Sequence, residues 1–490
     1  MARTRARYDL LLVTARIVWA AVLACALVAA YVLASAVEAP ARPTTSAALA
    51  PVDVGADIAA FYRDRGFRPL WVAQVRLRPE ARRLIAMLDG GGGRALGAAV
   101  EAARGGDPAR LTRADLLLSR AYADHVRAHH RPPAGGAMRY IDREAAPAPR
   151  SDRAILEEAA GAQSLAAHLA SVDRINPAYD GLSRGLAAYR ERWSRLPQDR
   201  LPARATQAAL RRRLGTNSLA DFQAAHGLPR SGQADSATIA ALNRGADHYE
   251  RLILANIERA RAIPARPDGR YILVDTASAR LWMIEDGRIA DSMRVVVGKR
   301  AMPTPLMAGM IRYAVLNPYW NLPPDLIRER ARKGPRAIAA ERLQVLSDWS
   351  PRARLLDPRR IDWRAVAAGR RFVNLRQTPG PHNMMGRIKF MMPNDLGVYL
   401  HDTPHRDLLR RDDRHLSSGC VRLEDAQRLA RWLFDGRVPA ASGTPEQRVD
   451  LPEPVPVYLA YFTALPARGG IVFQNDAYRR DVRPESARRP

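Results

Sequence analysis

The hydrophobic pattern of this chain changes character after Pro267, and that change divides the fold into two kinds of structure. Between residues 56 and 199, apolar side chains recur with helical spacing, for example at 116–129 and 182–193. After Pro267, short apolar or β-branched runs alternate with turn signals such as the Glu-Asp-Gly at 285–287. The sequence therefore predicts a multidomain α+β protein with a helical first half and a β-rich second half.

The β-rich half is divided by a long interruption. Its strand candidates lie at 271–275, 280–285, 292–297, 311–316, 386–391 and 397–401. Residues 321–376 separate them with proline-rich and helical sequence, which indicates a helical insertion, and an insertion beside a site often acts as a lid. We predict a β-rich domain at 269–440 and a C-terminal tail at 441–490, whose apolar run 455–462 packs against the helical or β-rich part.

The helical half is predicted to contain three pieces. Residues 56–199 form a helical scaffold, and residues 246–268 form a connecting helix. Between them, residues 200–245 carry the run LADFQAAHGLP, whose helix ends at its glycine, and then a glycine turn. A second short helix begins after Asp235 or Ser236, and either residue is a good N-cap. The spacing predicts at least two short helices joined by a turn.

The N-terminus predicts export. Arginines up to position 16 precede an uncharged run of 21 residues at 17–37, enough to cross a hydrocarbon layer of ~30 Å at ~1.5 Å per residue. Positive charge before an apolar segment keeps that end in the cytoplasm. Residues 1–16 are then cytoplasmic, 17–37 are a membrane anchor, and 38–55 are a linker rich in Ala, Pro, Thr and Ser. The alternative is a signal peptide cleaved after Ala36, which would release the protein.

The chain is strongly basic, with a formal net charge of +27 from 77 Lys and Arg against 50 Asp and Glu. Nearly all the basic residues are arginine, which a GC-rich coding sequence would produce without any function; the functional alternative is attraction to a polyanion. The basic residues are spread along the chain, without zinc-finger spacing or an aromatic RNP-like run, so we predict no nucleic-acid partner. Anionic lipid headgroups and an anionic cell-wall polymer fit the charge equally well.

The body of the chain contains a single thiol. The other of the two cysteines, Cys25, lies in the apolar N-terminal run, so Cys420 has no partner for an intrachain disulfide. An unpaired cysteine in an exported protein needs a reason to persist, which makes Cys420 a candidate nucleophile. A free thiol with a pKa of ~8.5 is only slightly ionised at neutral pH and needs a base. His401, at the end of the predicted strand 397–401, is the candidate base; the alternative is an inert cysteine beside a structural histidine.

Two further features of the run SSGCVRL at 417–423 favour a catalytic thiol. Gly419 lets the backbone approach a substrate and point N–H groups at an oxyanion. A helix predicted to begin at Glu424 and Asp425 brings the positive end of its dipole close to Cys420, where it favours the thiolate.

The segment 399–423 resembles the signature of L,D-transpeptidases of the YkuD type. That signature is a His, a stretch of intervening residues, then Ser or Thr, His, Gly, Cys, an aliphatic residue and Arg; here Ser418 replaces the second His. Residues 200–245 are similar to the small three-helix peptidoglycan-binding module, with Ser231-Gly232 in place of its usual Asp-Gly. Further runs resemble the subgroup with a membrane anchor, such a module and an inserted capping subdomain: VVVGK at 295–299, NPYWNLP at 317–323, PGPHNMMGRIKF at 379–390, PN at 393–394 and HDTP at 401–404.

This resemblance implies roles at the site. Cys420 attacks the donor stem peptide at the bond after meso-diaminopimelate and releases D-alanine, while His401 takes the thiol proton and later deprotonates the acceptor amine. The backbone N–H groups of Gly419 and Cys420 line the oxyanion site, with Tyr399 nearby. Arg422 orients the thiol loop or pairs with a substrate carboxylate.

Three more residues are implied to lie near the substrate. Asn383 and Gly386 belong to a run that the family places beside its active site. Ser418 occupies a position whose side chain is then not needed for proton transfer.

The resemblance implies a periplasmic cysteine transpeptidase that joins two diaminopimelate residues of peptidoglycan stem peptides in a 3→3 crosslink. No cofactor is expected, because the thioester conserves the energy of the broken bond and no His, Cys or Asp cluster has metal-ligand spacing. The expected partners are stem peptides, the inner membrane and cell-wall synthesis proteins, and a carbapenem is the implied covalent inhibitor. The alternatives are a non-catalytic wall-binding scaffold, and the same thioester chemistry with water or a lipoprotein lysine as acceptor.

Overall fold

The computed structural model describes residues 53–481 apart from 89–95, 98–99, 102, 132, 134–137, 265–268, 351, 439 and 469. The chain divides into two compact units, 1–53 and 54–490, and the fold below is that of the second. The predicted anchor 17–37 and most of the predicted linker lie outside the described residues. Among the residues that are described, no helix combines the length and apolar character needed to cross a membrane.

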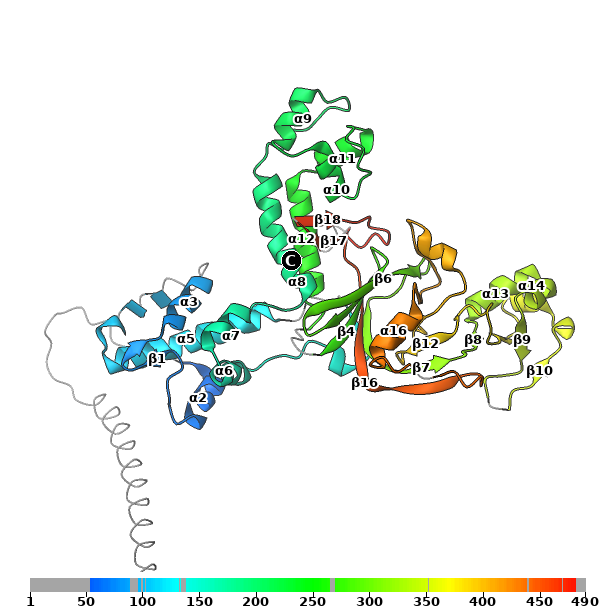
Figure 1. The fold of residues 1–490 in the computed structure, drawn as a ribbon, viewed down its shortest axis with the longest axis horizontal. Coiled ribbons are helices and arrows are strands. Elements are labelled where there is room, and N and C mark those ends of the chain that lie inside the picture. The colour runs from blue at the N-terminus through cyan, green and yellow to red at the C-terminus, as the bar shows by residue number, and fades with distance from the viewer. Residues whose placement is uncertain are drawn as a thin grey trace, which may run out of the picture. The chain divides into compact units, whose positions relative to one another are not determined.

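The N-terminal helical part is centred on helix α5 (Pro108–His129). Asp107 caps α5 by accepting a hydrogen bond from Arg110 N, and Pro108 stands in the first turn, where no N–H is needed. One face of α5 is buried at helical spacing in a core of its own, drawn in blue and cyan in Figure 1. The other elements of this part are α2 (Gly55–Asp64), β1 (Val72–Ala73), β2 (Arg76–Leu77), α3 (Pro79–Met87), η1 (Ala103–Gly105), α6 (Asp152–Gly161) and α7 (Leu165–Ser171); the short η2 (Arg143–Ala145) packs against β7 (Met307–Leu316) of the β-rich half instead.

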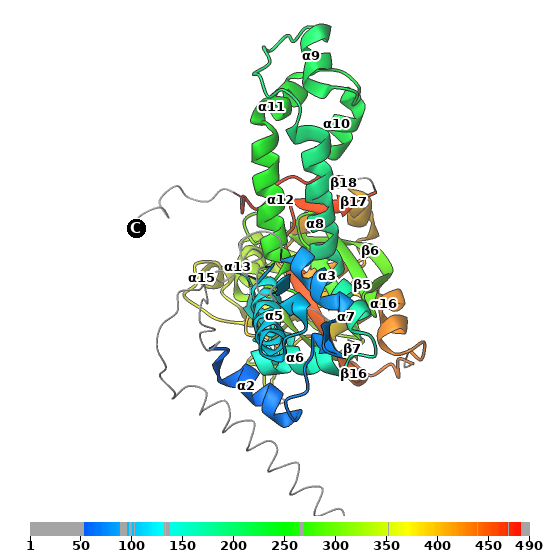
Figure 2. The same ribbon diagram turned by 90° about the vertical axis from the view of Figure 1, so that its left-hand side faces the viewer.

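Two longer helices follow and pack alongside each other, as Figures 1 and 2 show: α8 (Pro177–Tyr189), with its π-helical extension η3 (Arg190–Ser194), and α12 (Ala246–Ala260). Between them in the sequence are three short helices, α9 (Gln207–Leu214), α10 (Leu219–Ala225) and α11 (Ser236–Arg244). The predicted glycine stop is present, because Gly227 follows α10 with φ +69° and a Cβ there would lie 2.7 Å from Phe473 O. The predicted cap is also present, since Asp235 accepts a hydrogen bond from Thr238 N at 2.7 Å.

The described residues form a sheet of ten strands in the order β12-β13-β15-β6-β5-β4-β16-β7-β3, with β14 beside β6, and all but β3 come from the second half of the chain. Because β12 pairs with β7 as well as with β13, the sheet closes on itself around a buried core. Helix α16 (Ala426–Leu433) packs its apolar face against that core. The strands are β3 (Arg139–Tyr140), β4 (Arg270–Asp275), β5 (Arg280–Glu285), β6 (Arg288–Gly298), β7 (Met307–Leu316), β12 (Ile388–Met391), β13 (Leu400–His401), β14 (His415–Ser417), β15 (Val421–Leu423) and β16 (Gln447–Ala460).

All six predicted strands overlap an observed one, but the sheet extends beyond the predicted domain at 269–440. Strand β16 belongs to the predicted tail and lies between β4 and β7, and strand β3 comes from the predicted scaffold and pairs with β7. The β16 sequence contains three prolines within 452–456, a residue type that is rare inside a sheet, and the segment was predicted to be part of a C-terminal tail. A register shift between Asp450 and Val455 accommodates the first two of them.

The insertion at 321–376 is mixed rather than helical. It contains a four-stranded antiparallel sheet in the order β10-β9-β11-β8 and a separate core that includes Trp320, Ile338 and Leu375. Strands of two to four residues are too short to show the alternation that identifies a strand in sequence. Its elements are β8 (Trp320–Asn321), α13 (Pro324–Lys333), α14 (Pro335–Ala340), β9 (Leu343–Leu346), β10 (Leu355–Leu356), η4 (Pro358–Arg360), α15 (Trp363–Ala367) and β11 (Asn374–Gln377).

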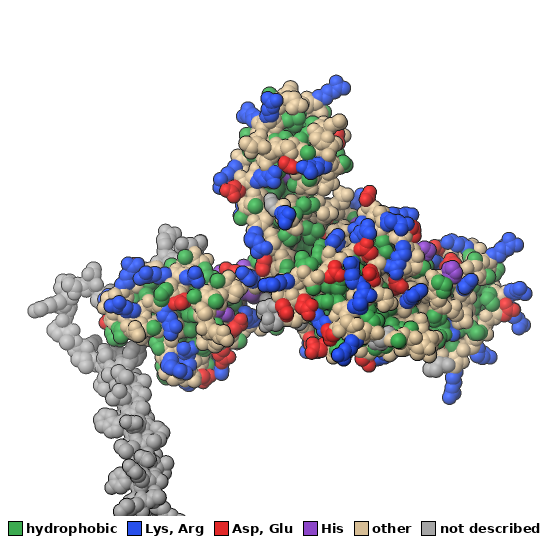
Figure 3. Space-filling view, in the orientation of Figure 1, with side chains coloured by type: hydrophobic (Ala, Val, Ile, Leu, Met, Phe, Trp, Pro, Cys, Tyr) green, Lys and Arg blue, Asp and Glu red, His purple; other side chains and the backbone are tan. Residues whose placement is uncertain are grey.

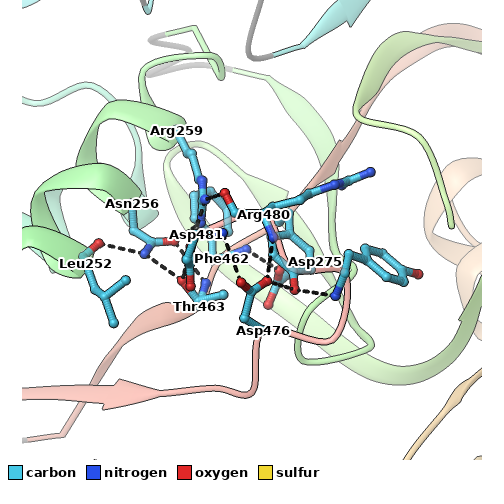
Figure 4. Close-up of polar contacts among 11 residues, drawn as sticks. Leu252, Asn256, Arg259, Asp275, Phe462, Thr463, Asp476, Arg480 and Asp481 are labelled. Carbon is cyan, nitrogen blue, oxygen red and sulfur yellow. Dashed lines mark hydrogen bonds and ion pairs between the residues drawn. The ribbon is translucent and has the colours of Figure 1, made fainter. Parts of the chain in front are cut away.

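After β16 the chain forms the hairpin β17 (Ala464–Ala467) and β18 (Gly470–Phe473), which packs on α8. Gly181 and Gly185 of α8 allow this close approach, because a Cβ at either would overlap Pro466 or Ile471. Residues 474–481 then return to the sheet, where Tyr478 donates to Gly298 O at the end of β6. Figure 4 shows that Asp481 of this segment pairs with Arg259 of α12.

Candidate active site

Two short parallel strands bring the candidate catalytic residues together. β13 pairs with β15 so that Leu400 faces Val421 and His401 faces Arg422, and Val421 N donates to Tyr399 O at 3.0 Å. Leu400 and Val421 are fully buried in the core of the closed sheet. Because side chains alternate along a strand, Tyr399, His401, Cys420 and Arg422 share the opposite face. The electrostatic neighbours agree with this alternation, because Tyr399 lies near Cys420, and Arg422 lies near both Cys420 and His401.

The loop that carries Cys420 is held by two hydroxyl groups. Ser417 Oγ donates to Cys420 O at 2.6 Å and accepts from Gly419 N at 3.2 Å. Thr304 Oγ1 donates to Gly419 O at 2.8 Å and accepts from Gly298 N at 2.9 Å. Gly419 has φ +117°, a conformation that favours glycine. The sequence analysis assigned no role to Ser417 or Thr304.

The turn that supplies Thr304 is closely packed. A Cβ on Gly298 would lie 2.5 Å from Thr304 N, so only glycine fits at the end of β6. Lys299 N donates to Ser417 O at 2.8 Å, which joins this turn to the Cys420 loop from a second side. The VVVGK run at 295–299 was noted in the sequence only for its resemblance to a family subgroup, and nothing in that run indicated Thr304.

Cys420 holds a neutral thiol in this state. Its side chain is half-buried and donates from Sγ to Gly397 O at 3.5 Å. Burial raises the pKa of the thiol, while a hydrogen bond from the Tyr399 backbone and the charge of Arg422 oppose that shift. Engaging His401 therefore requires the thiol to leave the Gly397 carbonyl.

His401 is a neutral imidazole with one nitrogen committed. The side chain is 2% exposed, and Nδ1 lies 2.6 Å from Asp402 O. A carbonyl oxygen only accepts, so Nδ1 carries the proton and Nε2 keeps its lone pair. Burial lowers the pKa of His401 to about 3, and the charges of Arg422 and Lys389 add to the shift. A neutral imidazole with a free Nε2 is the form that a general base needs.

The positive charge of Arg422 lies close enough to Cys420 and His401 to lower the pKa of both groups. Burial lowers the pKa of its guanidinium, and the Cys420 thiolate would raise it. Its Nε is buried and has no hydrogen-bond partner among the described residues. An unsatisfied buried donor on a cation is suited to a carboxylate ligand or to the thiolate.

The resemblance places Asn383 and Gly386 near the substrate, but in the structure both residues make contacts within the protein. Asn383 is 1% exposed; its amide donates to the carbonyls of Pro318, Gln377 and Thr378, and its Oδ1 accepts from Met385 N. A Cβ on Gly386 would overlap the Asp402 carboxylate, which accepts from Arg387 N at 2.9 Å. These residues hold the chain next to His401. Ser418, by contrast, is exposed beside Cys420.

Charge is dispersed around the site. Figure 3 shows Lys and Arg side chains scattered over the visible face and interspersed with Asp and Glu. Many of the arginines are paired, as in Arg294 with Glu424 and Arg428 with Asp291. Within the described part of the chain, no group of three or more His, Cys, Asp or Glu side chains is placed to hold a metal ion.

Residues 269–451 match the family model of the L,D-transpeptidase catalytic domain (YkuD), and residues 56–186 match that of a scaffold domain. A Haemophilus influenzae protein described as a candidate L,D-transpeptidase is 33% identical over 238 residues, covering 46% of this chain and 47% of the relative. This chain thus spans about half the length of that curated relative. Solved structures of an Enterococcus faecium L,D-transpeptidase variant and of a Mycobacterium smegmatis L,D-transpeptidase are both 14% identical. They cover 40% and 39% of this chain and 52% and 58% of their own, with TM-scores of 0.21 and 0.20.

Proposed function

We propose, from the L,D-transpeptidase catalytic domain at residues 269–451, that this protein joins peptidoglycan stem peptides in 3→3 crosslinks through a Cys420 thioester. The observation that carries the proposal is the pairing of β13 with β15 inside that domain, which sets His401 beside Arg422 and one residue from the level of Cys420. The neutral thiol of Cys420 and the neutral imidazole of His401 support the proposal, because such a thiol becomes a nucleophile only when the imidazole takes its proton.

Acylation begins when His401 Nε2 takes the proton of the Cys420 thiol. Sγ forms a bond to the carbonyl carbon of the donor peptide bond that follows diaminopimelate. When the tetrahedral intermediate collapses, the carbon–nitrogen bond breaks and the leaving D-alanine amine takes the proton from His401. The thioester that remains conserves the energy of the broken peptide bond, so no cofactor enters the reaction.

Transfer to the acceptor reverses these steps with a new amine. The side-chain amine of a second diaminopimelate attacks the thioester carbonyl, and His401 removes the proton that the amine loses. The carbon–sulfur bond breaks, the thiolate recovers its proton from His401, and the new amide is the crosslink. Arg422, with its unsatisfied Nε, is proposed to stabilise the thiolate or to bind a stem carboxylate.

The oxyanion of both steps is proposed to accept from Cys420 N–H. Gly419 N–H already donates to Ser417 Oγ, whereas Cys420 N–H has no hydrogen-bond acceptor among the described residues. In a planar trans peptide the C=O and the following N–H point in opposite directions. Because Thr304 holds Gly419 O on one side, Cys420 N–H points to the other. This sharpens the sequence expectation, which counted both N–H groups.

The remaining parts are proposed to bring the domain to its substrate. Residues 17–37 anchor the chain in the inner membrane with the catalytic domain in the periplasm, or a cut after Ala36 releases it. The helices α9 to α11 act as a peptidoglycan-binding module, and the insertion at 321–376 covers the substrate. Cell-wall synthesis proteins are the proposed protein partners.

The test uses purified protein, isolated stem peptides and a carbapenem. Cys420→Ala should abolish crosslinking and leave the thermal midpoint close to that of the unchanged protein. His401→Ala should form no carbapenem adduct by mass spectrometry within the time that saturates the unchanged protein. Crosslinking by the Cys420 variant would remove the nucleophile assignment, and a normal adduct in the His401 variant would remove the base assignment.

The same assay separates the acceptors. Tetrapeptide trimmed to tripeptide without dimers would identify water as the acceptor, and labelled lipoprotein attached to the stem would identify its lysine. A Cys420 thiol that resists both the carbapenem and small alkylating agents in folded protein would leave a non-catalytic wall-binding scaffold.

A further inference from the structure

The C-terminal segment 474–481 contacts the turn that supports the Cys420 loop. The phenol of Tyr478 donates to Gly298 O at 2.5 Å, and Arg480 Nη2 donates to Thr304 O at 3.4 Å. The match to the catalytic-domain family ends at residue 451, so these contacts come from sequence outside the matched domain. They add a support that the domain alone does not contain.

From this turn, two hydrogen bonds lead to the nucleophile loop. Gly298 N donates to Thr304 Oγ1, and Thr304 Oγ1 donates to Gly419 O. Thr304 is 0% exposed, and its hydroxyl uses its donor and one acceptor site in these two bonds. A displacement of Gly298 therefore changes the direction of the Gly419 carbonyl, and with it the direction of Cys420 N–H.

Tyr478 is itself rigidly held. Its ring stacks on Tyr461 with centroids 5.3 Å apart and an angle of 17°, and its N–H donates to the Tyr461 phenol at 2.9 Å. Tyr461 donates in turn to Asp476 at 2.6 Å, and Asp476 accepts from the backbone N–H groups of Arg480 and Asp481. Burial raises the pKa of Tyr478, so its phenol stays protonated and able to donate.

The segment is also fixed to helix α12. Asp481 pairs with Arg259 at 2.8 Å, and Arg259 donates to Arg480 O at 3.0 Å. Asn256 of the same helix donates to Thr463 Oγ1 at 3.0 Å and accepts from Thr463 N. Figure 4 shows these groups converging between α12 and the end of β4. The contacts with α12 therefore fix the segment that holds the Tyr478 phenol against Gly298 O.

We propose that Tyr478 is a positioning residue for the Cys420 nucleophile, acting through Gly298, Thr304 and Gly419. The inference rests on the proposed transpeptidase function. Removing the phenol oxygen frees Gly298 O and loosens the turn, so the oxyanion donor is held less accurately. Misplacing a reacting group by a fraction of an ångström to 1 Å costs up to about 100-fold in rate. The loss should appear in the chemical step and not in substrate binding.

The test compares Tyr478→Phe with Tyr140→Phe in the full chain. Tyr140 is the matched control, because its half-buried phenol also donates to a backbone carbonyl, Ala262 O at 2.7 Å, away from the Cys420 loop. Carbapenem acylation should slow about 10- to 100-fold in Tyr478→Phe and less than about 2-fold in Tyr140→Phe. The apparent binding constant of the carbapenem and the rate of Cys420 alkylation by iodoacetamide, which needs no oxyanion site, should stay within about 2-fold in both.

A second pair of variants tests the middle of the relay. Thr304→Ser keeps the hydroxyl and should acylate within about 3-fold of the unchanged protein, whereas Thr304→Val loses both bonds and should fall as Tyr478→Phe does. Acylation by Tyr478→Phe at the unchanged rate, or an equal loss in Tyr140→Phe, would overturn the proposal. If the unchanged protein crosslinks stems, either result removes only this inference; if the unchanged protein neither acylates nor crosslinks, the proposed function itself fails.

Discussion

The pH dependence of acylation tests the electrostatics of the Cys420 and His401 pair. Burial lowers the pKa of His401 to about 3, against an ordinary value of ~6.5 for histidine. At pH 5 the imidazole is then ~99% neutral, whereas a histidine of pKa ~6.5 would be only ~3% neutral. Since burial also raises the pKa of Cys420, the reactive form is a neutral thiol beside a neutral imidazole across this range. The rate of carbapenem acylation should therefore be nearly the same at pH 5 and pH 7.

The measurement is single-turnover acylation followed by mass spectrometry at pH 5 and pH 7, with circular dichroism at each pH to show that the protein is folded. The carboxylate of the carbapenem stays ionised over this range, so changes in rate report the enzyme. An ordinary histidine would lower the rate about 25-fold at pH 5, from the ratio of its neutral fractions at the two pH values. A fall of that size in folded protein would refute the neutral pair. A rate that follows the thiolate fraction alone would also refute it.

Two further predictions concern stability. Burial lowers the pKa of His226 to about 3. Between about pH 6.5 and pH 3 the unfolded chain therefore binds a proton that the folded chain does not, and the free energy of unfolding falls as the pH falls through that window. His226→Gln should remove about 2 kcal/mol of the loss in unfolding free energy between pH 7 and pH 5, measured by urea unfolding. If the difference in unfolding free energy between pH 7 and pH 5 is the same in His226→Gln as in the unchanged protein, the prediction is wrong. Gly386→Ala should cost about 2–4 kcal/mol through its overlap with Asp402, whereas Gly369→Ala, with similar φ and open space around its Cβ, should cost about 1 kcal/mol, and equal losses would show that the overlap is relieved.

Short-range patterns in the sequence predicted six of the ten strands that the described residues form in the large sheet. The predicted strand 280–285 coincides with β5, and the Asp235 cap follows from its own side chain, because both depend on residues close in sequence. The candidate pair Cys420 and His401 came from a lone thiol and a strand end and stays a prediction; the pairing of β13 with β15 sets His401 opposite Arg422, two residues after Cys420.

The supports of the site depend on contacts between distant segments. Thr304 lies far from Gly419 in sequence, and Tyr478 lies beyond the matched domain, so no local pattern connects either residue to the thiol. Asn383 was predicted to bind substrate because its run resembles one that the family places beside the active site, and such a resemblance does not show where a side chain points. In the structure its side-chain amide donates to Pro318 O and accepts from Met385 N, both within the protein. The pairing of β12 with β7, which closes the sheet, also joins segments that are distant in sequence, so no single run of residues predicts it.

The two strands that lie outside the predicted catalytic domain bear on how the protein is divided for experiments. A fragment cut at residues 269 and 451 would lack β3 and most of β16, leaving open backbone edges on both β4 and β7. Exposed strand edges recruit other chains, so such a fragment should aggregate or pair with itself. The cut would also discard Asp142, which bonds Met310 N and Arg312 of β7. The smallest piece of this chain that can be expected to fold alone therefore begins before residue 139 and extends past residue 460.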